Sequence, residues 1–221
     1  ILDQIIFTLK NIKIIDEIVL AVSLGSENKC FSEYAKKHSL SFVEGDEIDV
    51  LQRLNKGLNY VEATDLFRVT SESPFLYTQP VNQAWETHLS KLNDATFFDD
   101  IIDGCGFEII KSEALKKSWL MGEERHRSEM STLFIRENQN LFKISKIECP
   151  QELIRKDIRL TVDYPEDLII CRAVYQEFLK DNIPAISSLN HFDIVKFLDK
   201  RQDLLKLINP FCEGGYKSMY K

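Results

Sequence analysis

Positive charge is in deficit in this sequence, because 28 Lys and Arg stand against 35 Asp and Glu, for a formal net charge of −7 at pH 7. Such a balance lacks the overall basic surface that binds nucleic acid, so we expect no nucleic-acid partner. No apolar run approaches the ~18 residues of a membrane span. The apolar start is interrupted by Asp3, Gln4 and Lys10, unlike a secretory signal. We therefore expect a cytoplasmic protein without a membrane partner.

Cysteine is scarce and scattered. The five cysteines are odd in number and never form a CxxC pair. This argues against a disulfide framework or a zinc cluster and favours a reducing compartment. The sequence also lacks GxSxG, HExxH, GxGxxG and P-loop motifs, so it carries none of these short signatures of hydrolase, metalloprotease or nucleotide-binding sites.

Glycine and proline are few, 8 and 6 of 221 residues, and no run of them marks a linker. There are no internal repeats beyond one seven-residue pattern that occurs twice, and there is no low-complexity tract. The length offers ample material for a core. We expect a single domain over residues 1–221, with an inserted portion around 95–150 that could form a contact in a homodimer.

What the sequence does contain is alternation of helical and strand patterns. The β-branched run at 17–23 predicts a strand covered on both faces. Helical spacing at 1–12, 26–39, 46–60 and 80–92 alternates with strand patterns at 17–23, 40–45 and 65–70. This order predicts a three-layer α/β fold with mainly parallel strands, including 17–23, 66–70 and 157–162.

The pattern changes after residue 95. Residues 95–111 predict two strands around a turn at Gly104–Gly106. Residues 140–149 predict a further strand. We expect helices at 112–119, 127–138, 165–180 and 192–208, followed by an irregular basic tail at 209–221.

One seven-residue pattern occurs twice. "RVTSESP" (68–74) and "RLTVDYP" (159–165) both read Arg, aliphatic, Thr, any residue, acid, any residue, Pro. Each places a carboxylate, Glu72 or Asp163, where a strand ends, and ligands bind at such strand ends in open α/β sheets. Two carboxylates there suit Mg²⁺. The alternative is that Glu72 is a turn acid and that Asp163 caps the helix that follows.

Other candidates carry weaker signals. The basic cluster at 125–127 could bind a phosphate or a sugar carboxylate, and the acidic stretch at 99–103 could bind a metal. For both, solvated surface is the favoured interpretation. His38, His88 and His191 show no metal-ligand spacing, and we expect them on helix surfaces.

An ordered set of segments resembles a known family. The segments are "EGDEIDVLQRL" (44–54), "FRVTSESPF" (67–75), "DGCGFEIIKSEAL" (103–115), "RSEMSTLFI" (127–135), "IRLTVDYPEDLIICRAVYQEF" (158–178) and "LINPFCEGGYKSMYK" (207–221). Together they resemble the sugar cytidylyltransferases, and in particular the branch related to spore coat polysaccharide biosynthesis protein F. The likeness runs in order over almost the whole chain.

The resemblance implies the nucleotide-diphospho-sugar transferase fold, related to glycosyltransferase type A. It also implies an enzyme of cell-surface polysaccharide biosynthesis that transfers CMP from CTP to a sugar acid and releases pyrophosphate. The implied cofactor is Mg²⁺, held by the catalytic carboxylates Glu72 and Asp163. The implied substrate-binding residues are Arg53, Arg68, Glu108 and Arg127.

The sequence departs from the family pattern at three places. The family's first strand and its basic Gly/Ser loop have no counterpart before Ile1, so we expect the 221-residue chain not to bind CTP tightly by itself. Glu72 replaces the family's aspartate, and the stretch Arg127–Ser131 lacks its histidine. Either a segment is missing or the chain is a diverged homologue.

Two alternatives to the enzyme therefore stay open. One is a non-catalytic sugar- or nucleotide-binding homologue that acts through a partner. The other is a glycosyltransferase of the same fold, against which the stretch Ser71-Glu72-Ser73 counts, because such enzymes usually carry Asp-x-Asp there.

Overall fold

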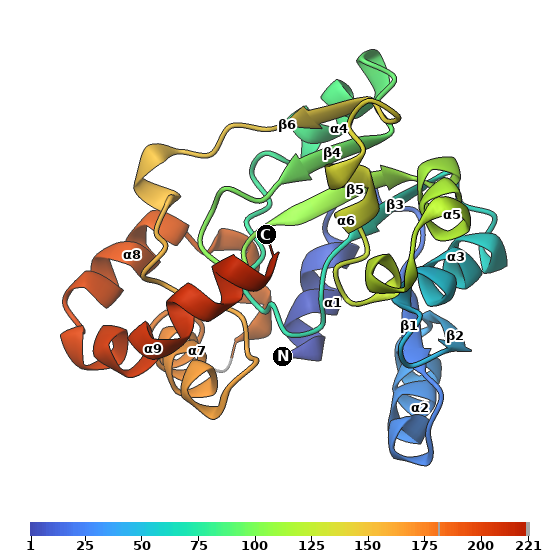
Figure 1. The fold of residues 1–221 in the computed structure, drawn as a ribbon. Coiled ribbons are helices and arrows are strands. Elements are labelled where there is room, and N and C mark those ends of the chain that lie inside the picture. Colours follow the sequence, from blue (N-terminus) through green and yellow to red (C-terminus); the bar gives the residue numbers. More distant parts are fainter. Residues whose placement is uncertain (181, 220–221) are drawn as a thin grey trace.

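The computed structural model describes residues 1–180 and 182–219 and has a mixed α/β fold (Figure 1). A small sheet pairs β1 (Val19–Ser23) in parallel with β2 (Ser41–Gly45). A larger sheet has the strand order β3-β5-β4-β6. Its strands are β3 (Asp65–Arg68), β4 (Ala95–Phe98), β5 (Phe107–Lys111) and β6 (Ile144–Lys146).

Strand directions in the larger sheet place three strand ends at one edge. β5 is antiparallel to both β3 and β4, whereas β4 and β6 are parallel. β3, β4 and β6 therefore run in one direction and β5 runs in the other. The mixed sheet with mainly parallel strands, expected from the sequence, is confirmed.

Helices lie around both sheets. α7, α8 and α9 group on one side of the larger sheet, while α2 and α3 accompany β1 and β2 (Figure 1). The described helices are α1 (Leu2–Lys10), α2 (Lys29–His38), α3 (Val50–Tyr60), α4 (Val81–Ser90), α5 (Ser112–Met121), α6 (Leu133–Glu137), α7 (Pro165–Phe178), α8 (His191–Asp199) and α9 (Gln202–Met219). Among the described residues, no helix combines the length and the apolarity that crossing a membrane requires.

The central strands are covered on both faces. Phe97 and Phe98 are neighbours on β4, and both are buried, yet they belong to two different apolar clusters. On β5, Ile109 and Ile110 are divided in the same way. Because successive strand residues point to opposite faces, the larger sheet is the middle layer between two apolar cores.

α3 shows how local chemistry sets an element boundary. The Asp46 carboxylate accepts hydrogen bonds from the backbone of Ile48 and Asp49, at 2.8 and 2.9 Å, and so holds a turn before the helix. Asp49 then caps the helix by accepting from the backbone of Gln52 at 2.8 Å. The helix therefore begins at Val50, later than the sequence pattern predicted.

The strand expected at 157–162 does not form. The segment makes only an isolated bridge between Asp103 and Arg159, although its side chains at Ile158 and Leu160 are buried. Pairing stops because the neighbouring residues, 99–106, form the loop between β4 and β5, which offers no continuous ladder partner.

Three helix predictions are also corrected. The single helix expected at 192–208 is two helices, α8 and α9, separated at Lys200–Arg201. The segment 127–138 is helical only in α6, after a 3₁₀ turn at Glu124–Arg127. The expected irregular tail is helical up to Met219, and its last two residues lie outside the described residues.

Two histidines expected on the surface are buried. His88 contacts the Thr96 hydroxyl at 3.0 Å and the Asp65 carboxylate at 3.1 Å, which ties α4 to β4 and β3. His191 donates to the backbone carbonyl of Phe75 at 2.8 Å. Their partners come from distant segments, so helix periodicity alone could not identify them.

Gly104, in the loop between β4 and β5, allows a test of how closely this loop approaches the backbone of Thr161. Its φ is +88°, and an added Cβ would lie 2.5 Å from the Thr161 backbone nitrogen. We expect Gly104→Ala to lower the free energy of unfolding by about 1–3 kcal/mol, measured by urea denaturation. Gly57→Ala is the matched control, because its Cβ would meet Val19 and Val43 at 3.5 and 3.7 Å in α3. It should raise stability by about 0.5–1 kcal/mol. Equal stability of Gly104→Ala and wild type would contradict the close approach.

Candidate functional site

Charged residues follow the strands of the larger sheet at the edge where β3, β4 and β6 end. Glu72 follows β3, Asp99 follows β4, and Lys146 closes β6. Asp103 precedes β5, which starts at the same edge. This is the edge at which open α/β sheets bind ligands.

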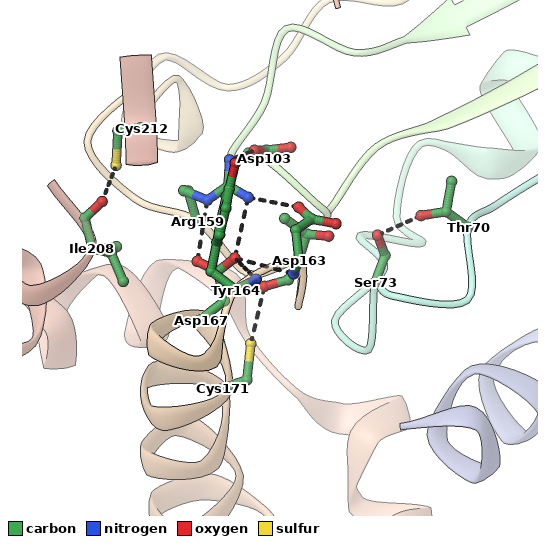
Figure 2. A network of polar contacts seen from close by, with 11 residues as sticks. Thr70, Ser73, Asp103, Arg159, Asp163, Tyr164, Asp167, Cys171, Ile208 and Cys212 are labelled. Carbon is green, nitrogen blue, oxygen red and sulfur yellow. Dashed lines mark hydrogen bonds and ion pairs between the residues drawn. The ribbon is translucent and has the colours of Figure 1, made fainter. Parts of the chain in front are cut away.

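At this edge a buried arginine holds three carboxylates, a group that we call the Arg159 cluster (Arg159, Asp103, Asp163, Asp167; Figure 2). Arg159 is 2% exposed. Its Nη1 donates to Asp103 at 2.7 Å and its Nη2 to Asp163 at 2.6 Å. Its Nε and Nη2 donate to the two oxygens of Asp167 at 3.1 and 3.2 Å. Every guanidinium nitrogen is therefore bonded to a carboxylate.

Asp167, rather than Asp163, caps the start of α7. Oδ2 of Asp167 accepts hydrogen bonds from the backbone N–H groups of Asp163 and Tyr164, both at 3.1 Å. A carboxylate in the first turn also interacts favourably with the helix dipole. The cap interpretation of Asp163 is thus wrong. Its side chain is 45% exposed, which leaves it accessible to a ligand.

The charges in the Arg159 cluster do not balance. Three carboxylates share one guanidinium, so the cluster carries about two excess negative charges when all are ionised. Burial raises the pKa of Asp103, Arg159 opposes this rise, and the charges of Asp163 and Asp167 add to it. The expectation that Asp103 lies in a solvated loop is wrong, whereas Asp100 is 57% exposed.

Glu72 lies in the loop after β3 and is half-buried. Its Oε1 accepts from the Ser71 hydroxyl at 3.2 Å. A hydrogen bond of 2.9 Å between the hydroxyls of Thr70 and Ser73 closes this loop (Figure 2). The described contacts include none between Glu72 and Asp163, and a shared ion stays a prediction.

The donor set can be tested against Mg²⁺. The part of the chain that the structure describes contains no group of three or more His, Cys, Asp or Glu side chains placed to hold a metal ion. Mg²⁺, however, usually takes one or two protein carboxylates and completes its shell with water and substrate phosphates. Asp163 binds Arg159 through Oδ2 alone among its described contacts, and Glu72 carries a second hard-oxygen donor. These two residues fit such a site chemically.

A second network surrounds Glu108 on β5. Its Oε2 accepts from Arg68 at 2.8 Å, and its Oε1 accepts from Arg136 at 2.9 Å and from the Thr132 hydroxyl at 2.7 Å. Burial alone would raise the pKa of Glu108, but the two arginines and these hydrogen bonds outweigh it, and the pKa is lowered. Glu108, predicted to bind substrate, therefore has both oxygens occupied by the protein.

Arg136 is a site residue that the sequence did not reveal. Its guanidinium lies 3.8 Å from the centre of the Phe97 ring and also pairs with Asp99. Lys146 lies 3.5 Å from the same Asp99 carboxylate. The prediction of a solvated loop is thus wrong for Asp99, which is 10% exposed. The two carboxylates Glu108 and Asp99 therefore balance the charges of Arg68 and Arg136 in this part of the edge.

Arg53 and Arg127, also predicted to bind substrate, lie around the N-terminus of α3. Arg53 donates to the backbone carbonyl of Asp46 at 2.7 Å. Arg127 lies 3.8 Å from the Asp49 carboxylate, which also accepts from Trp119 at 2.9 Å. No described hydrogen bond or ion pair links either arginine to the Arg159 cluster.

The basic cluster at 125–127 divides between surface and core. Arg125 is 55% exposed and pairs with Glu137 at 2.7 Å. His126 is buried, and its Nδ1 accepts from the Glu123 backbone at 2.8 Å. The interpretation of this stretch as a fully solvated helix start is therefore wrong at His126.

Two known proteins are similar to this chain in sequence. An uncharacterized protein of Methanocaldococcus jannaschii is 26% identical over 219 residues, which cover 99% of this chain and 88% of that protein. The spore coat polysaccharide biosynthesis protein SpsF of Bacillus subtilis is 25% identical over 163 residues, which cover 73% of this chain and 68% of that protein. No family model matches the chain.

Solved structures share the fold. A cytidylyltransferase from Leptospira borgpetersenii superposes with a TM-score of 0.80 at 19% identity, covering 92% of this chain and 84% of that one. A CMP:2-keto-3-deoxy-manno-octonic acid synthetase in complex with CTP superposes with a TM-score of 0.56 at 9% identity, covering 80% and 87%. The cytidylyltransferase-like fold and the resemblance to the sugar cytidylyltransferases are confirmed.

Glu108→Gln tests the second network. The substitution leaves Arg68 and Arg136 without their shared carboxylate, and we expect it to lower the free energy of unfolding by about 3–5 kcal/mol. Because the folded-state pKa of Glu108 is lowered, its contribution is present above its ordinary value of 4.5 and is lost as the pH falls below it. Urea denaturation between pH 7 and pH 3 should show a smaller loss of stability on acidification in the variant than in wild type.

The control for this test is Glu123→Gln, because Glu123 is 75% exposed and its ion pair with Arg125 lies at the surface. Its stability should stay close to wild type across the same pH range. A Glu108→Gln variant as stable as wild type at pH 7 would show that Glu108 does not hold the two arginines.

Proposed function

We propose that this protein is a nucleotidyltransferase that transfers CMP from CTP to a sugar acid and releases pyrophosphate, in the biosynthesis of a cell-surface polysaccharide. The observation that carries the proposal is the cytidylyltransferase-like fold over 92% of the chain, with charged residues of both signs at the ligand-binding edge. The names of the solved relatives supply CTP and the sugar acid, and that of SpsF supplies the polysaccharide.

In the proposed reaction, a hydroxyl oxygen of the sugar acid attacks the α-phosphorus of CTP. A new P–O bond forms as the bond from the α-phosphorus to the bridging oxygen of the β-phosphate breaks. Pyrophosphate leaves, and the hydroxyl proton passes to solvent or to a nearby carboxylate. The protein contributes mainly by positioning the two reactants and by stabilising the charge that develops between them.

The residues divide by charge into two proposed roles. Glu72 and Asp163 would hold Mg²⁺, which supplies electrostatic stabilisation of the phosphate oxygens when it is bound. Arg68, held by Glu108, would face the anionic groups of CTP or of the sugar acid. Arg53 and Arg127 would assist from the N-terminus of α3.

The remaining parts of the proposal concern organisation. The chain would form one domain with a dimer contact in the portion around 95–150. It would work in the cytoplasm, and the free thiol at each of its five cysteines fits a reducing compartment.

A direct assay decides between this enzyme and the alternatives. The protein is incubated with Mg²⁺, each of the four nucleoside triphosphates and a panel of sugar acids, and pyrophosphate release is measured. The proposal expects release only with CTP and a sugar acid, and a CMP-sugar by mass spectrometry. Nucleotide or sugar binding without turnover would favour a non-catalytic homologue. Sugar transfer from a finished nucleotide sugar would favour a glycosyltransferase.

Asp163→Asn tests the proposed metal ligand. Loss of the charge should lower turnover by at least about 100-fold, because the carboxylate would bind Mg²⁺ directly. The fold should be retained, since Asp163 is 45% exposed. Turnover and thermal unfolding are the two measurements. The control is Asp157→Asn, whose carboxylate is 51% exposed and also pairs with an arginine, Arg155. Unchanged turnover in Asp163→Asn would rule out the role.

A further inference from the structure

We infer that Arg159 is a positioning residue that holds the Asp163 carboxylate in the orientation in which it binds a divalent cation. This inference rests on the proposed function and adds to it a residue that touches neither substrate nor metal. It is carried by the geometry of the Arg159 cluster (Figure 2).

Within the Arg159 cluster, Arg159 and Asp167 are buried, whereas the side chain of Asp163 is accessible to solvent. Arg159 is 2% exposed and Asp167 is not exposed at all, whereas Asp163 is 45% exposed. Arg159 and Asp167 therefore lie beneath the surface. Asp163 is the most exposed of the three carboxylates, since Asp103, which also binds Arg159, is 26% exposed.

The contacts fix Asp163 from two directions. Its side-chain Oδ2 accepts from Arg159 at 2.6 Å, and its backbone N–H donates to Asp167 at 3.1 Å. Asp167 also binds Arg159 in a two-oxygen contact, so the two supports hold each other. An exposed aspartate without such contacts would sample several rotamers and lose entropy when it bound a metal.

The charge of Arg159 is not what attracts a cation. A guanidinium beside a carboxylate repels a metal ion, so a purely electrostatic effect of Arg159 would weaken metal binding. A positioning effect has the opposite sign, because residues that orient metal ligands typically raise affinity by about 10–100-fold. The two roles can be distinguished by experiment.

Arg159→Lys is the main test because it keeps the charge and removes the planar set of donors. An ammonium group cannot reproduce the parallel contacts to Asp167 together with those to Asp163 and Asp103. The probe is Mn²⁺ in the presence of CTP, titrated by calorimetry and by electron paramagnetic resonance. We expect the Mn²⁺ dissociation constant to rise by about tenfold or more, with thermal unfolding still cooperative.

Arg155→Lys is the matched control. Arg155 also pairs with two carboxylates, those of Asp157 and Asp199, at 2.7 and 2.8 Å, and it is 23% exposed. The Arg155→Lys variant should bind Mn²⁺ with the same affinity as wild type. If Arg159→Lys does not fold, Asp167→Asn replaces it, because this substitution keeps the size of the side chain and removes the charge that holds Arg159. The same loss of affinity is expected.

The outcomes separate this inference from the proposed function. Wild-type binding of Mn²⁺ with CTP and an unchanged affinity in the folded variant would overturn the positioning role and leave the proposed function intact. A tighter affinity in either variant would also overturn it, because the contacts of Arg159 would then oppose metal binding. Because tight CTP binding is not expected of the 221-residue chain, the titration is made at a CTP concentration high enough to detect weak binding. Failure of the folded wild-type protein to bind Mn²⁺ under these conditions would refute the proposed function, and the inference with it.

Discussion

The burial of one guanidinium among three carboxylates is the constraint on which the architecture of the ligand-binding edge depends. Arg159 has almost no exposure, so its charge would be costly without partners. Those partners are Asp103 in the loop before β5, Asp163 just before α7, and Asp167 in the first turn of α7. One side chain thus joins the sheet to the group of C-terminal helices.

Two charged networks lie at this edge. Around Glu108, Arg68 and Arg136 share one carboxylate, and Arg136 also pairs with Asp99, so the arginines and carboxylates of this network balance. Around Arg159, three carboxylates share one arginine, and this excess of negative charge is suited to a cation. A nucleoside triphosphate with its metal carries both kinds of charge, and an edge that combines arginines with surplus carboxylates agrees with the proposed reaction.

Local patterns predicted much of the fold, because they depend on neighbours in the sequence. The β-branched run of β1, the turn between β4 and β5, and the proline at the head of α7 were all visible in the sequence. The prediction of a strand at 157–162 was wrong for a physical reason. Its apolar pattern reflects burial, and burial does not guarantee a partner strand, which the loop at 99–106 does not supply.

The site was less predictable because its partners are distant in sequence. The repeated pattern drew attention to the acids Glu72 and Asp163, although its first residue, arginine, carried an equally strong signal. Arg159 and Asp103 are separated by 56 positions, and Arg68 and Glu108 by 40. No periodicity links such pairs, and the burial of His88 and His191 was missed for the same reason.

The structure gives the repeated pattern a common physical basis. Arg68 lies opposite Glu108 in the ladder between β3 and β5, and Arg159 lies opposite Asp103 in the isolated bridge. Both arginines are therefore paired across the backbone with a carboxylate on one short segment, 103–108, and both also form an ion pair with it. Each acid of the pattern follows its arginine by four residues. Because the segment 103–108 anchors both arginines, it ties the two segments that carry Glu72 and Asp163 to one short stretch of chain.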